Sequence, residues 1–221
     1  MDNRKNWTKR QDQLRKALSS RAHFDEAMRL FLAQHAAVHT AEISGCGWSL
    51  HDESLAGLTE AQIKFVPRPG QNSIAWLLWH ITRIEDMTIN TLALEQPQVL
   101  NADWSARLCF SQLDCGASMD ETDVAALSNQ ISIQALLAYR VSVGRRTRDA
   151  VLRLDATQSK EIVPTSTVQK LVDEGSISEK GNWLFEYYKN RTKGFFLTRT
   201  ATSHNFIHLN EAGRLRAKLL R

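Results

Sequence analysis

Two histidines and a glutamate near the C-terminus have the spacing of side chains that share one face of a helix. His204 and His208 are four residues apart, and Glu211 follows three residues later. On a helix, two imidazoles at this spacing lie one above the other, about 6 Å apart at Cβ, and can bind one metal ion. Glu211 could then be a ligand, an acceptor that orients a ligand, or a base. Ordinary helix histidines have the same spacing, so a third ligand is needed to define a site.

His80 is a candidate for that third ligand. It lies in the middle of an apolar stretch that begins at Asn72-Ser73, with Trp76 one turn before it and Ile84 one turn after it. A buried imidazole costs free energy unless its nitrogens have partners. A lone histidine on such a helix is more often a hydrogen-bonded core residue than a ligand, but the histidine pair at the C-terminus favours the ligand.

His35, His39 and Arg140 also lie on or beside apolar stripes, and each has two interpretations. His35 and His39 form a second pair at a spacing of four, either as core-edge histidines or as ligands or proton carriers in the same cavity. Arg140 either extends its guanidinium to solvent or faces a pocket and binds an anionic ligand or cofactor. Extension to solvent is the simpler expectation for Arg140.

The elements that must position these residues are helices. Apolar residues recur at spacings of three and four in four long segments, and Ser, Asn and Gly occur where helices start or stop. We expect long helices over about 20–44, 73–94, 128–154 and 195–215. Between them lie connections over 45–71, 95–129 and 156–195, with short helices near 59–64, 165–172 and 183–188. The sequence therefore predicts an all-α four-helix bundle, whose metal sites lie among facing side chains.

Composition sets the class of protein. The chain has 221 residues, 43% hydrophobic and 24% charged, and contains only 4 prolines and 10 glycines. These values indicate a globular protein rich in long helices rather than a β-sandwich. No apolar run approaches the ~20 residues of a membrane span, and the N-terminus lacks the apolar segment of a secretory signal. We therefore expect a cytoplasmic protein.

Charge and cysteine content exclude further classes. Three cysteines without CxxC spacing fit neither a disulfide framework nor a thiolate zinc site. The net charge is +4, and the basic residues concentrate at the two ends of the chain. No nucleic-acid-binding motif accompanies them, so we do not expect a nucleic-acid partner. Residues 1–21 are polar and basic, and we predict an N-terminal arm there, followed by the bundle domain over 22–221.

Two of these motifs carry a resemblance to a known family. Asn72-Ser-Ile-Ala-Trp-Leu-Leu-Trp-His80, with Ile84-Glu85-Asp86, resembles the second helix of the DinB-like family of metal-dependent enzymes. His204-xxx-His208-xx-Glu211 resembles that family's fourth helix. The resemblance implies a DinB-like bundle in which His80, His204 and His208 hold a divalent metal. It also implies a homodimer, and for some members a thiol-dependent transfer reaction with a low-molecular-weight thiol.

These residues lead to three hypotheses. The first is a metal-dependent transferase or hydrolase of a small molecule, with zinc, nickel or iron on three imidazoles and with Glu85, Glu211 or Glu42 as orienting or proton-carrying groups. The second is a metal- or small-ligand-binding bundle without catalysis, acting as a sensor or stress-response accessory. The third is a helical interaction protein, which predicts that His80 lies more than about 8 Å from the other two histidines, too far to share an ion.

Overall fold

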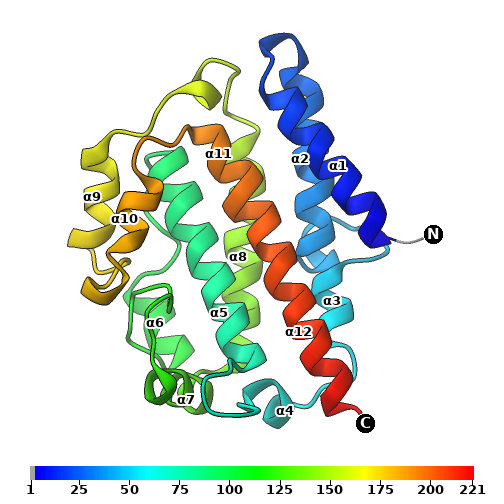
Figure 1. The fold of residues 1–221 in the computed structure, drawn as a ribbon, viewed down its shortest axis with the longest axis vertical. Coiled ribbons are helices and arrows are strands. Elements are labelled where there is room, and N and C mark those ends of the chain that lie inside the picture. The colour runs from blue at the N-terminus through cyan, green and yellow to red at the C-terminus, as the bar shows by residue number, and fades with distance from the viewer. Residues whose placement is uncertain (1–2) are drawn as a thin grey trace.

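The computed structural model describes residues 3–221, and they form a bundle of long helices surrounded by short ones (Figure 1). The predicted all-α fold is confirmed: within this range the backbone is helical apart from loops and an isolated β-bridge between Ile162 and Thr192. The four bundle elements are α2 (Phe24–Val38), α5 (Ile74–Glu85) continued by η3 (Asp86–Ala93), α8 (Ile133–Val151), and α11 (Lys193–Thr198) continued by η6 (Arg199–His204) and α12 (Asn205–Leu219).

The element α5–η3 is the centre of the bundle. Every residue from Ile74 to Ala93 is buried, as expected of a helix that is apolar around most of its circumference. Ser73 begins α5 by accepting a hydrogen bond from the backbone N–H of Trp76. From Asp86 the helix continues with wider π-type turns. α5 contacts both α8 and α12, so its side chains meet those of two other long helices.

Two predicted helix boundaries are wrong. The first long helix ends at Val38, well before residue 44, because His39 adopts an extended conformation and Thr40 caps a short helix, η2 (Ala41–Ile43). The third begins at Ile133, capped by Ser132, because the residues around 128 belong to a separate helix, α7 (Glu121–Gln130). In both places a local cap overrides a continuing apolar pattern.

The first helix, α1 (Asn3–Leu18), packs against α2 (Figure 1). Trp7 stacks on Phe206 of α12 with ring centroids 3.8 Å apart. Gln11 donates hydrogen bonds to Thr202 Oγ1 and to the carbonyl of Thr198. Residues 1 and 2 of the predicted N-terminal arm lie outside the described part of the chain, and the division of the chain at residue 21 stays a prediction.

A buried ion pair orders the long connection after η3. Asp86 accepts a hydrogen bond from Arg83 and from the backbone N–H groups of Val99 and Leu100. Arg83 also donates to the carbonyl of Leu113, so one pair of side chains fixes two distant loop segments. The predicted connection over 95–129 is therefore fixed to the bundle at Val99, Leu100 and Leu113.

The remaining short elements lie in the connections. They are η1 (Arg21–His23), α3 (Leu50–Leu55), α4 (Glu60–Lys64), α6 (Ala102–Leu108), η4 (Gln158–Lys160), α9 (Thr165–Asp173), η5 (Glu179–Gly181) and α10 (Trp183–Tyr188). Among residues 3–221, no helix combines the length and apolar character that crossing a membrane requires.

Candidate metal centre

Three histidines from two bundle elements converge at one point. His80 comes from α5, His204 is the last residue of η6, and His208 lies in the first turn of α12. One ring nitrogen from each lies within 4.8 Å of the others, and the Nε2 atoms of His80 and His204 are 3.2 Å apart. The interaction-protein hypothesis, which required more than about 8 Å, is therefore wrong.

Hydrogen bonds outside the triad set the orientation of two rings. The Nδ1 atom of His80 lies 2.7 Å from the carbonyl oxygen of Cys115, and because a carbonyl can only accept, this nitrogen carries the proton. In the neutral ring, Nε2 of His80 then presents a lone pair to His204. His208 Nδ1 lies 3.1 Å from Glu211 Oε2, which leaves Nε2 of His208 free in the same way. Such outer partners fix the tautomer of metal-binding histidines.

Burial keeps His80 and His204 of the triad neutral. Desolvation lowers the pKa of His80 to about 4, and desolvation together with the nearby His80 and His208 holds the pKa of His204 well below its usual value. Trp76 covers one face of His80, with ring centroids 4.7 Å apart and planes 10° apart. Neutral imidazole is the form that binds metal ions.

A loop glycine brings the Cys115 carbonyl to His80. Gly116 has a φ of +78°, and a Cβ at this position would lie 3.0 Å from Trp76 Nε1. Glycine adopts this conformation at no steric cost. The sequence did not predict this contact, because any residue can supply a backbone carbonyl. The available signal was the glycine that follows Cys115.

The donor set of the triad fits a divalent cation. Two imidazole lone pairs 3.2 Å apart repel unless a proton or a cation lies between them. Two ligands bound to one tetrahedral ion at about 2.0–2.1 Å are separated by roughly 3.3 Å. The distance between the His80 and His204 nitrogens therefore fits a pair of ligands as well as a hydrogen bond from one ring to the other. His204 Nδ1 is buried and has no partner among residues 3–221.

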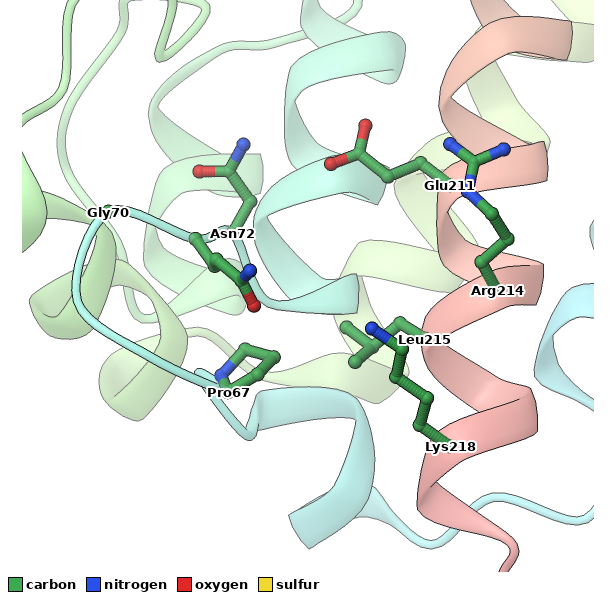
Figure 2. Close-up of a pocket in the computed structure, with 8 residues that line it drawn as sticks. Pro67, Gly70, Asn72, Glu211, Arg214, Leu215 and Lys218 are labelled. Carbon is green, nitrogen blue, oxygen red and sulfur yellow. The ribbon is translucent and has the colours of Figure 1, made fainter.

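A hollow adjoins the triad through Glu211 (Figure 2). Its cavity volume is about 210 Å³. One wall is the C-terminal half of α12 and the other is the loop that precedes α5, as Figure 2 shows. The hydrogen bond between His208 and Glu211, both on α12, links the triad to this hollow. The lining residues are Pro67, Gly70, Gln71, Asn72, Glu211, Arg214, Leu215 and Lys218.

Glu85, predicted as an orienting or proton-carrying group, lies in a different cluster. Its carboxylate is completely buried and receives hydrogen bonds from four donors, which satisfies it fully. These donors are His35 Nε2 at 2.9 Å, His39 Nε2 at 2.8 Å, Thr147 Oγ1 at 2.9 Å and Asn205 Nδ2 at 3.1 Å. Burial opposes ionisation, but the neighbouring His39 and His35 and their hydrogen bonds keep the pKa of Glu85 well below its usual value.

His35, His39 and Glu85 also bring three potential ligand atoms within 4.8 Å of one another. Their N···O distances of 2.8 and 2.9 Å are those of charge-assisted hydrogen bonds, shorter than the roughly 3.3 Å between two ligands of one tetrahedral ion. The expectation that His35 and His39 line the same cavity as His80 is not met, because they turn to Glu85.

Arg140 does not extend to solvent, so that expectation is wrong. Its side chain is buried and donates to Thr82 Oγ1, to the carbonyl of Val38 and to Asn205 Oδ1. Burial lowers the pKa of Arg140 to about 10, with Glu85 acting in the opposite direction. Arg140 borders a second hollow, away from Glu211, and its binding of an anionic ligand stays a prediction.

Glu42, the remaining candidate, is exposed and forms an ion pair with Arg145, with its carboxylate oxygen 2.7 Å from the guanidinium. Within residues 3–221 its ion-pair partner is Arg145, not any of the three triad histidines. The structure therefore brings together His80, His204, His208 and Glu211, and separates Glu85, Arg140 and Glu42 from them.

Comparison with known proteins identifies the family. The profile of the DinB superfamily matches residues 47–174, more than half of the chain, so this protein belongs to the DinB superfamily. The matched segment contains His80 but ends before His204 and His208. A search of curated proteins found no match. The family assignment thus supports the bundle and its metal-binding character, and the second and third histidines are placed by the structure.

Proposed function

We propose that this protein is a metal-dependent transferase or hydrolase of a small molecule. In this proposal His80, His204 and His208 hold one zinc, nickel or iron ion. The observation that carries the proposal is the 3.2 Å approach of two Nε2 atoms, one of which belongs to a ring whose proton is committed to Cys115. Three nitrogen ligands leave further coordination positions, the arrangement of catalytic rather than structural zinc.

When bound, the ion would act as a Lewis acid and would lower the pKa of a coordinated water or thiol. The protein's own part is orientation and proton handling. Cys115 and Glu211 hold the outer nitrogens of His80 and His208, so both rings present their other nitrogen at a fixed angle. Trp76 shields one face of His80 from water.

Glu211 is the proton carrier we propose. Its side chain is 41% exposed and borders the hollow, while Oε2 accepts the hydrogen bond from His208. The hydrogen bond from His208 lowers the pKa of Glu211, so the carboxylate is available as an acceptor at neutral pH. Cys115 is not a nucleophile in this scheme, because burial raises the pKa of its thiol to about 12.

The resemblance to thiol-dependent members of the family supports a low-molecular-weight thiol as co-substrate, and it supports a homodimer. Measuring whether the metal-loaded protein binds a thiol would test the thiol co-substrate. Sedimentation equilibrium would test the homodimer, and a monomer at all concentrations would exclude it.

The first test is elemental analysis of purified, tag-free protein beside a variant carrying His80→Ala, His204→Ala and His208→Ala. We expect about one zinc, nickel or iron ion per chain in the parent and none in the triple variant, because its three ligands are gone. Replacement of the exposed His23 by alanine is the matched control and should leave the metal content unchanged.

Absence of metal from the parent, after incubation with each ion in turn, would overturn the proposal. Metal bound at the triad without turnover in a screen of thiol-transfer and hydrolysis substrates would favour the non-catalytic alternative, a metal-binding sensor or accessory protein.

A further inference from the structure

The hollow beside Glu211 is lined by two cations, of which Arg214 interacts electrostatically with Glu211. Arg214 and Lys218 line it, both are exposed, and neither has a hydrogen bond or ion pair with any residue in the described range 3–221. Glu211 contributes one negative charge and is already hydrogen-bonded to His208. Two positive charges and one negative charge leave the lining with a net charge of about one positive unit.

The cations lie further along the helix that carries His208. Arg214 and Lys218 lie six and ten residues beyond His208 on α12, which corresponds to roughly 9 and 15 Å along the helix axis. Their side chains lean back toward the start of the helix, which shortens that span. In Figure 2, Glu211, Arg214 and Lys218 project from α12, and Asn72 and Pro67 line the facing loop.

The facing loop adds neutral and positive groups. Gln71 and Asn72 bring side-chain amides to the hollow. Directly after them Ser73 caps α5, whose first turn carries the positive end of the helix dipole. The hollow therefore has a cationic, hydrogen-bonding lining, and its Glu211 connects it to the triad through the hydrogen bond with His208.

We propose that this hollow holds the carboxylate of an elongated small molecule, the substrate or thiol co-substrate, whose opposite end reaches the three histidines. This inference rests on the proposed function, because it assumes that the reaction takes place at the triad. A net charge of one matches a single carboxylate better than a phosphate dianion. Arg214 offers that group a planar fork of donors, and Lys218 offers a mobile ammonium.

The test compares two thiols that differ in one group. Mercaptohexanoate and mercaptohexanol have the same chain and the same thiol, and only the first carries a carboxylate. Isothermal titration at low salt should show zinc-loaded parent protein binding mercaptohexanoate about fivefold more tightly, equivalent to about 1 kcal/mol. In the variant Arg214→Gln, Lys218→Met this preference should disappear. Replacement of the exposed Lys170 of α9 by methionine is the control and should leave the preference intact.

The outcomes separate this inference from the proposed function. If both thiols bind with equal affinity, or if the double variant keeps the preference, the hollow does not recognise a carboxylate and only this inference fails. If zinc is present by elemental analysis and neither thiol binds, the thiol reaction fails and the inference fails with it. Circular dichroism of the double variant should match the parent, because both replaced side chains are exposed.

Discussion

The buried histidines His35, His39 and His80 differ in what their ring nitrogens face. In His80 a carbonyl takes the Nδ1 proton, so the other nitrogen faces His204 as a lone pair. In His35 and His39 the Nε2 atoms lie beside a carboxylate, which turns both into hydrogen-bond donors. Two histidines four residues apart therefore belong to a candidate metal site in one place. In the other they form a hydrogen-bonded cluster with Glu85, which we call the clamp (His35, His39 and Glu85).

The clamp gives a prediction for Glu85→Gln. We expect this change to lower the free energy of unfolding by about 3–5 kcal/mol, because it removes a buried charge and leaves donors without acceptors. Urea denaturation followed by circular dichroism measures the loss. Glu42→Gln is the matched control, since its ion pair with Arg145 is more than half exposed and should contribute no more than about 1 kcal/mol. Equal losses in the two variants would contradict the clamp.

At the scale of elements, the position of His39 beside Glu85 depends on close packing between α8 and the end of α2. Gly144 of α8 lies against the end of α2, where a Cβ would be 2.6 Å from His39 Nδ1 and 2.8 Å from Ile43 Cδ1. A larger residue would push His39 away from Glu85. Glycine is therefore required here by the space between two helices and not by its own backbone conformation.

This packing predicts the sign of the change in stability that Gly144→Ala causes. In an ordinary helix interior, alanine is favoured over glycine by about 1 kcal/mol. Here we expect a destabilisation of roughly 1–3 kcal/mol, the cost of overpacking a filled interface. Chemical denaturation measures it, with Ser142→Ala on the same helix as the control and a change within about 0.5 kcal/mol. A stabilised Gly144→Ala variant would show that the interface has room.

At the scale of the whole molecule, buried histidines make stability depend on pH. Desolvation lowers the pKa of His39 and His51 below the usual 6.5. As the pH falls below 6.5 the unfolded chain takes up protons that the folded protein does not, so stability present above that pH is progressively lost. Glu85, whose pKa is depressed, acts in the same direction below its usual 4.5.

We therefore expect metal-free protein to lose about 1.4 kcal/mol per pH unit below 6.5 for each histidine that stays neutral when folded. Guanidinium unfolding in the presence of a chelator, between about pH 7.5 and pH 5, measures the slope. His51→Gln should flatten it, and His23→Gln, on an exposed histidine, should not. A slope that His51→Gln leaves unchanged would mean that His51 is protonated in the folded protein.

The sequence by itself determined the features that depend on neighbours along the chain. Apolar periodicity gave the four long helices, and the cap at Ser73 gave the start of the most buried one. The spacing of His204 and His208 placed them on one face because helix geometry is set locally. Together with the stretch that ends at His80, and with the resemblance of both motifs to the DinB-like family, this spacing predicted the histidine triad that the structure brings together.

Only the tertiary structure decided which groups meet across helices. The direction in which Glu85 points depends on the rotation of α5 against α2, α8 and α12, and that rotation is set by packing over the whole bundle. The same holds for Arg140, which the core encloses although its charge favours solvent. The carbonyl of Cys115 reaches His80 because Arg83 and Asp86 fix a distant loop. Such contacts join residues far apart in sequence, so local sequence patterns do not predict them.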